Sequence, residues 1–233
     1  MIPLRDNIGA RRLASIVSLL LAANVMVFIY EARLGGAAES LLREYGMIPA
    51  RFTHLAVDGQ FTALWAPVTL LTSLFLHGDF LHIAGNMLYL YIFGPAVEAR
   101  FGHGRFFWFY LTAGIAAGLA MVWMQPVSRM PVVGASGAIA GVLGAYFVLY
   151  PRARIVTIVP FFVFVEIIEV PAVLYLLLWF AVQLYAGLQS VGGHGATVGG
   201  VAWWAHVGGF LFGIALAPVL ARPRSRGGKT GLW

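Results

Sequence analysis

The sequence predicts an all-α membrane protein: a bundle of six transmembrane helices in which the fourth helix is short and central. Of its 233 residues, 61% are hydrophobic and 10% are charged, whereas soluble domains are about half apolar and about a quarter charged. The apolar residues gather in stretches long enough to cross a hydrocarbon layer, which takes about 20 helical residues. Cysteine is absent, which excludes disulfides and thiolate metal sites. We expect one membrane domain over residues 13–221, because the chain is too short for a second folded module of ordinary length.

The six candidate spans cover residues 13–30, 79–97, 106–124, 135–150, 170–189 and 202–221. The first follows two arginines, as a signal peptide would. However, its apolar run is longer than usual and no convincing cleavage site follows, so we expect a retained helix. The fourth is short for a full crossing. Its N-terminal end should therefore lie below the membrane surface, where irregular backbone is tolerated only beside a protein cavity or water.

The segments between the spans differ in character. Residues 31–78 mix charged residues with aromatics and leucines, and we expect short helices lying in the membrane interface. A passive connector is the equally open alternative. The loop before the last span has five glycines from Gly192 to Gly200, so it is expected to be mobile. Glu166 and Glu169 precede the fifth span, where we expect them to be solvated or paired, away from any chemistry.

The distribution of lysine and arginine predicts the orientation in the membrane. With the N-terminus in the cytoplasm, eleven of the fifteen basic residues face the cytoplasm and four face the outside. Both termini are therefore expected in the cytoplasm, residues 1–12 as a short extension and residues 222–233 as a basic tail that helps to set the topology. The net charge of +6 is explained in this way, and we expect no nucleic-acid partner. No organelle-targeting extension precedes the first span, so the expected location is a bacterial inner membrane.

Polar side chains within the spans are the candidate functional residues, because they are costly to place in a membrane. The second span carries His82 and Asn86, the fourth begins near Ser136, and the sixth carries His206. With a rise of about 1.5 Å per residue, Ser136 and His206 each lie about 9 Å below the outer face of the hydrocarbon layer. The same estimate places His82 and Asn86 about 4 and 10 Å below it. All four side chains are expected in one layer.

The position of Ser136 at a helix start suits a nucleophile. Free N–H groups and the positive end of the helix dipole favour a developing anion there, and the neighbouring Gly134 and Gly137 let other groups come close. His206 is the only histidine well inside another span at matching depth, so we expect it to act as the base that activates the hydroxyl. No carboxylate lies at that depth, which predicts a Ser–His dyad.

His82 and Asn86 complete the predicted chemistry. They are four residues apart and therefore share one face of the second span. Side-chain N–H groups on that face are expected to donate to the oxyanion that forms when a serine attacks a carbonyl.

These residues have two other interpretations. Ser136 taken alone fits a small residue in a helix interface, since the glycines after it recur at the spacing of membrane helix packing, as do Gly209 and Gly213. A zinc site is the alternative chemistry, with His77, His82 and His206 as ligands. It is disfavoured because the chain has no His-Glu-x-x-His motif, no cysteine and no carboxylate beside them, so we expect no metal or other cofactor.

Together these residues resemble the rhomboid family of intramembrane serine proteases, over about residues 65–218. The motifs that match are Gly-x-Ser-Gly at GASG (134–137), Ala-His-x-x-Gly at AHVGG (205–209) and His-x-x-x-Asn at HIAGN (82–86). The resemblance implies that Ser136 is the nucleophile and His206 the general base. It also implies that His82, Asn86 and the backbone N–H of Ser136 form the oxyanion hole.

The resemblance extends to a structural motif and has two departures. VEARFG resembles the family's Glu-x-Arg loop, which implies a structural role for Glu98 and Arg100. Ala66 follows Trp65 where the family often has arginine, which affects loop packing. Ala140 stands one turn after the serine, where some members have a tyrosine that stacks on the histidine, which affects how His206 is held.

The family resemblance implies a water-filled cavity open to the outer side and an endopeptidase that cleaves in or beside the transmembrane segments of single-pass proteins. Because a helical substrate must unwind to expose its carbonyl, we expect small or helix-breaking residues near the cut. The fifth span, free of charge over residues 170–188, is expected to move as a lateral gate. A catalytically inactive relative that binds membrane clients, and a small transporter with a broken helix, remain the alternatives. Membrane lipid is the surrounding partner in every case.

Overall fold

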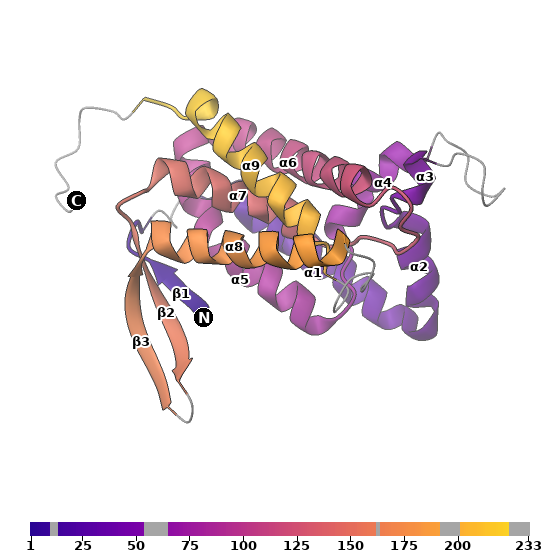
Figure 1. Cartoon of the computed structure of the whole chain (residues 1–233), viewed down its shortest axis with the longest axis horizontal. Coiled ribbons are helices and arrows are strands. Elements are labelled where there is room, and N and C mark those ends of the chain that lie inside the picture. The colour runs from indigo at the N-terminus through magenta and orange to yellow at the C-terminus, as the bar shows by residue number, and fades with distance from the viewer. Residues whose placement is uncertain (10–13, 54–64, 162–163, 192–200, 224–233) are drawn as a thin grey trace.

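The bundle carries a small sheet at one end and short helices at the other (Figure 1). The computed structural model describes residues 1–9, 14–53, 65–161, 164–191 and 201–223. The glycine-rich loop expected to be mobile, residues 192–200, lies outside the described residues, as do residues 224–233 of the basic tail.

The described residues contain five helices that are long and apolar enough to cross a membrane, so the protein is an integral multi-pass membrane protein. They are α1 (Ser15–Leu34), α5 (Phe80–Phe101), α6 (His103–Met124), α8 (Ala172–Val191) and α9 (Trp203–Leu220). The short helix α7 (Ser136–Leu149) has 14 residues and begins at the serine, as predicted. These six helices match the six predicted stretches in order, and the expected all-α membrane bundle is confirmed, with the addition of a sheet described below.

Helix α7 forms the centre of the bundle, in contact with α5, α6, α8 and α9. Every residue from Gly137 to Tyr146 is buried. Glycines bring α7 and α9 into backbone contact: a Cβ atom on Gly144 would lie 2.0 Å from the carbonyl oxygen of Phe210, and one on Gly213 would lie 2.0 Å from that of Gly141. The small residues of both helices therefore serve close helix packing, which is the role that small residues have in membrane bundles.

The segment between α1 and α5 forms the short helices that were expected. They are the 3-10 helix η2 (Gly35–Ala37), α2 (Ala38–Tyr45), α3 (Ala50–Thr53), α4 (Ala66–Thr72) and the 3-10 helix η3 (Ser73–Phe75). This segment also holds the chain that leads into α7. Met47 and Val132 exchange two backbone hydrogen bonds of 3.0 and 2.7 Å, and the Gly134 N–H donates to the Ser73 carbonyl at 2.8 Å. The segment therefore supports the start of α7 and does more than connect α1 to α5.

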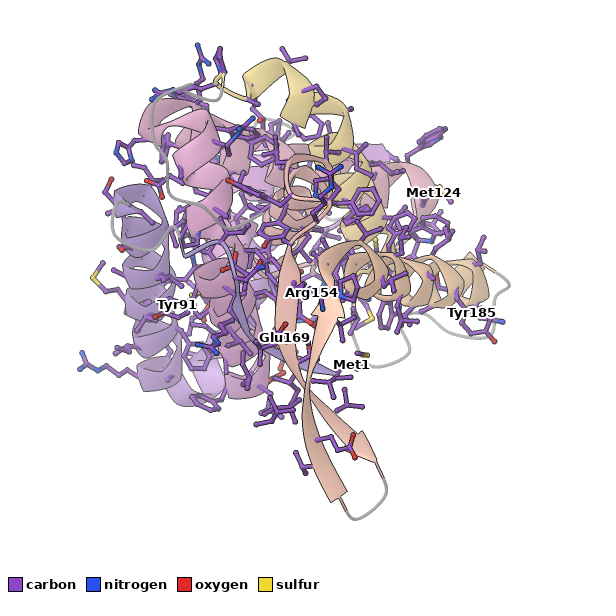
Figure 2. All side chains as sticks on the ribbon, turned by 90° about the vertical axis from the view of Figure 1, so that its left-hand side faces the viewer. Met1, Tyr91, Met124, Arg154, Glu169 and Tyr185 are labelled. Atoms are coloured by element: carbon purple, nitrogen blue, oxygen red, sulfur yellow. The ribbon has the colours of Figure 1, made fainter. Side chains whose placement is uncertain are left out.

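A three-stranded antiparallel sheet is the part of the fold that the sequence analysis did not predict. Its strands, in the order β1-β2-β3, are β1 (Ile2–Asp6), β2 (Arg154–Phe161) and β3 (Phe164–Pro171). The Tyr146 hydroxyl of α7 donates to Asp6 at 2.9 Å, which fastens β1 to the bundle. Figure 2 shows the β2–β3 hairpin extending away from the helices, with Arg154 near its base. Glu166 and Glu169 lie on β3, and both are exposed.

Glu98 fastens α5 to the start of α1. Its side chain is 1% exposed, and its two carboxylate oxygens accept the backbone N–H groups of Ile16 at 3.0 Å and Val17 at 2.8 Å. Helix α1 has no side-chain cap of its own, so this distant carboxylate satisfies N–H groups that the first turn leaves free. The Arg100 carbonyl accepts the Arg222 N–H at 2.8 Å and so joins the end of α9 to the same region.

Candidate active site

A cavity of about 610 Å³ lies among α5, α7, α8 and α9. Its lining includes all four of the polar side chains that the sequence analysis placed in one layer, His82, Asn86, Ser136 and His206. These residues come from three helices, α5, α7 and α9, that are separate in the sequence, and the bundle brings them to one cavity.

Ser136 and His206 are in direct contact. The Ser136 Oγ lies 2.8 Å from the His206 Nε2, a hydrogen-bond distance. Ser136 is the first residue of α7, while His206 lies in the first turns of α9 and is 9% exposed. A serine hydroxyl that donates to an imidazole nitrogen can lose its proton to it, which is the arrangement required of an activated nucleophile and its base.

Gly134 shapes the approach to the serine. Its φ of +116° is a conformation that side chains rarely adopt. A Cβ atom there would lie 2.6 Å from the His82 Nε2 and 3.4 Å from the Asn86 Nδ2. Glycine is therefore needed both for the backbone turn and for the space that the side chains of α5 occupy. The His82 ring accordingly lies against the backbone that leads into Ser136.

Gly137 lies in the interface between α6 and α7. A Cβ atom on it would lie 2.6 Å from the Ala117 Cβ of α6. Gly137 thus lets α6 and α7 pack closely, and it is not among the residues that line the cavity.

His82 and Asn86 of α5 line the same cavity as Ser136. Asp79 caps the start of α5 by accepting the His82 backbone N–H at 2.8 Å, which fixes the turn that carries the His82 ring. Asn86 is 8% exposed, and its Nδ2 has no hydrogen-bond partner among the described residues. A buried donor without a partner costs free energy, about 1–3 kcal/mol. An amide kept in this state beside a serine is suited to a ligand oxygen.

His77 lies behind His82 and does not line the cavity. The two rings meet edge to face at 5.2 Å between centroids. The His77 backbone N–H is 3.2 Å from both carboxylate oxygens of Glu31, which ties the start of α5 to α1. Burial lowers the pKa of His77 to about 4, with a smaller contribution from His82, so the ring is neutral near pH 7.

Helix α8 contributes two residues that the sequence analysis missed. The Gln183 Oε1 lies 2.7 Å from the His206 Nδ1, and the Trp179 ring lies 5.9 Å from the His206 ring between centroids. Gln183 is a polar side chain in an apolar span, which is the criterion that selected His206, so the signal was present in the sequence. Ala140, the position where some family members have a stacking tyrosine, is buried in α7 and offers no ring to His206.

Comparison with known proteins identifies the family. Residues 64–223, more than half of the chain, match the model of the rhomboid domain. The chain is 36% identical to the mitochondrial rhomboid protein 1 of Saccharomyces cerevisiae over 96 residues, which cover 40% of this chain and 28% of that protein. It is also 36% identical to the rhomboid protease GluP of Bacillus subtilis over 121 residues, 52% of this chain and 22% of that protein.

A longer match is to the human mitochondrial presenilin-associated rhomboid-like protein, 28% identical over 204 residues, 84% of this chain and 45% of that protein. The chain thus spans less than half the length of each of these relatives. The domain match covers α5 to α9, which include the four helices around the cavity. The chain belongs to the rhomboid family, which includes serine intramembrane proteases.

Proposed function

We propose that this protein is an intramembrane serine endopeptidase that cleaves single-pass membrane proteins in or beside their transmembrane segments, through a Ser136–His206 dyad. The observation that carries the proposal is the 2.8 Å contact between the Ser136 Oγ and the His206 Nε2, inside a cavity formed by membrane-spanning helices. Membership of the rhomboid family supports proteolysis in general.

The first half of the reaction forms an acyl-enzyme. The Ser136 Oγ attacks the carbonyl carbon of the scissile peptide bond, and its proton passes to the His206 Nε2. The carbonyl oxygen becomes an oxyanion, which accepts hydrogen bonds from Asn86, from His82 and from the backbone N–H of Ser136. His206 then returns the proton to the amide nitrogen, the C–N bond breaks and the amine leaves.

The second half restores the enzyme. A water molecule loses a proton to His206 and attacks the acyl carbon, and a second tetrahedral intermediate collapses with release of the carboxyl product. The proton returns to the Ser136 Oγ. The cavity of about 610 Å³ has room for water beside a substrate segment, which this step requires. No metal or cofactor has a part in these steps.

The substrate must present an extended backbone to the serine, because a helix hides its carbonyls in hydrogen bonds. Small or helix-breaking residues near the cut lower the cost of local unwinding. We propose that the cavity opens to the outside, with both termini in the cytoplasm of a bacterial cell whose inner membrane holds the protein. The bias of eleven basic residues against four supports this orientation.

Cleavage of a single-pass model substrate by the purified protein in detergent tests the proposal. Wild type, Ser136→Ala and His206→Ala are compared, and the products are mapped by mass spectrometry. A defined cut made by wild type alone is expected. Equal cutting by all three proteins would contradict the dyad, and a panel of substrates that all stay intact would favour a catalytically inactive, client-binding relative.

A further inference from the structure

We propose that Gln183 is a positioning residue, which holds His206 in the tautomer that leaves Nε2 free to accept the serine proton. This inference rests on the proposed function and extends it to a third residue, contributed by α8. It concerns the orientation and protonation of the base, while the reacting atoms remain those of Ser136 and His206.

Gln183 and His206 are in direct contact. The Gln183 Oε1 and the His206 Nδ1 are 2.7 Å apart, and the two residues are 6% and 9% exposed. The bond joins α8 to α9, and on the opposite side of the ring the His206 Nε2 meets the Ser136 Oγ at 2.8 Å. Both ring nitrogens therefore have one partner each, and the two partners lie on different helices.

A second contact fixes the orientation of the Gln183 amide. The Gln183 Nε2 lies 3.3 Å from the Trp179 carbonyl oxygen, one turn earlier in α8. A carbonyl oxygen only accepts hydrogen bonds, so the NH₂ group of Gln183 must be the one that faces it. The amide oxygen then faces His206, which leaves no freedom to exchange the two ends of the amide.

The Gln183 oxygen determines the tautomer of His206. Because the Gln183 oxygen only accepts, the His206 Nδ1 must carry the proton of that hydrogen bond. A neutral imidazole has one N–H, so Nε2 has a lone pair and accepts from the Ser136 hydroxyl. The opposite tautomer would place two hydrogen-bond acceptors 2.7 Å apart at Nδ1 and would present an N–H to the serine.

The aromatic neighbours of His206 hold the ring in place but do not select between its two tautomers. Trp179 and Trp203 lie with their centroids 5.9 and 6.3 Å from that of the imidazole. Neither ring distinguishes Nδ1 from Nε2, whereas Gln183 does. A neutral amide also avoids the cost of burying a carboxylate between membrane helices. Gln183 thus supplies the orienting hydrogen bond that an acid supplies in a triad, without the charge.

The experiment measures kcat and KM over a range of pH for wild type, Ser136→Ala, Gln183→Leu, Gln183→Glu and a matched control. The control is Gln125→Leu. The Gln125 Nε2 donates to the Ser190 Oγ at 3.0 Å, so it also bonds to α8 but lies outside the cavity lining. The control shows whether loss of any hydrogen bond to α8 lowers activity, or only loss of the one to His206. The other titratable groups that line the cavity, Asp79, His82 and Tyr89, are unchanged in every variant.

In Gln183→Leu the Nδ1–H loses its partner, and kcat is expected to fall about 10- to 100-fold while KM stays within about twofold. Gln125→Leu is expected to retain the wild-type kcat. In Gln183→Glu the acceptor returns as a carboxylate that stabilises the imidazolium. Activity is expected to recover at least in part, and the acidic limb of the kcat/KM profile is expected to move to higher pH.

A wild-type kcat in Gln183→Leu would overturn the inference, as would an equal loss in Gln125→Leu. Should Gln183→Leu fail to fold, Gln183→Glu decides: an acidic limb at the wild-type pH would overturn the inference. An inactive wild type, or activity retained in Ser136→Ala, would instead overturn the proposed function. The two failures are therefore distinguishable.

Discussion

The hydroxyl groups of Tyr89 on α5 and Tyr175 on α8 lie 2.7 Å apart, and Tyr89 lines the cavity that holds the serine. This hydrogen bond joins α5 to α8, the helix that is expected to move as a lateral gate. Helix α8 also carries Gln183 and Trp179 against His206. A displacement of α8 would therefore break the hydrogen bond to Tyr89 and disturb the contacts of His206 at the same time.

The hypothesis that α8 moves as a lateral gate predicts that fixing α5 to α8 blocks cleavage of membrane substrates. The chain has no cysteine, so cysteines introduced at Tyr89 and Tyr175 form a unique pair for a thiol-reactive crosslinker. Crosslinked protein is expected to lose cleavage of a transmembrane substrate and still react with a small fluorophosphonate at Ser136. The single-cysteine variants, treated identically, are the controls. Unchanged cleavage by the crosslinked protein would rule out this gate.

Gly134→Ala is expected to lower kcat/KM by about 100-fold or more, because a Cβ atom there meets the His82 ring and its φ of +116° becomes strained. Gly104→Ala is the matched control, since nothing lies within 4 Å of its added Cβ. This control is expected to retain activity, and it replaces a helical glycine by a better helix former. Steady-state kinetics on both variants measure the difference, and a fully active Gly134→Ala would refute the account of the loop.

Asn86→Leu is expected to separate activity from stability. It removes a proposed oxyanion donor, so kcat should fall about 10²- to 10³-fold. It also removes a buried Nδ2 that has no partner among the described residues, so the thermal unfolding midpoint should stay the same or rise. Asn24→Leu, which changes a buried asparagine of α1 outside the cavity, should leave kcat intact. A large loss of stability in Asn86→Leu with normal kcat would assign Asn86 a structural role.

Glu98→Ala is expected to act on stability alone. It leaves the N–H groups of Ile16 and Val17 without their acceptor. Loss of the acceptor is expected to lower the free energy of unfolding by about 1–3 kcal/mol for the buried Val17 N–H and by less for the partly buried Ile16 N–H. Unfolding in a detergent titration measures this loss, and kcat per folded molecule should be unchanged. Glu39→Ala, which breaks an exposed ion pair with Arg43, should have little effect. A lower kcat at normal stability would mean that Glu98 acts on the site.

The sequence predicted the helices well because long apolar runs have few other structures available. Each predicted span ends within about one helical turn of the observed helix. The depth estimate also succeeded in grouping His82, Asn86, Ser136 and His206, since helical rise is nearly constant. The short length of α7 followed from the distance between the serine and the arginines beyond Tyr150.

The missed features depend on contacts between distant parts of the chain. The strand at residues 2–6 pairs with β2, about 150 residues later, and no local pattern connects them. Gln183 carries no charge, but a neutral amide buried among apolar residues still costs free energy when it has no hydrogen-bond partner, so its contact with the distant His206 matters. Gly137 lies beside Ser136 in the sequence, but a Cβ atom on it would meet the Ala117 Cβ of α6, a neighbour that local sequence does not identify.

We propose that His206 activates Ser136, and reaction with a fluorophosphonate probe tests this activation without any assumption about the substrate. Purified wild type, Ser136→Ala and His206→Ala are incubated with the probe, and the modified residue is located by peptide mass spectrometry. The account predicts an adduct on Ser136 in the wild type, none in Ser136→Ala and a rate at least about 100-fold lower in His206→Ala. An unmodified Ser136 in the wild type, or equal labelling of wild type and His206→Ala, would contradict it.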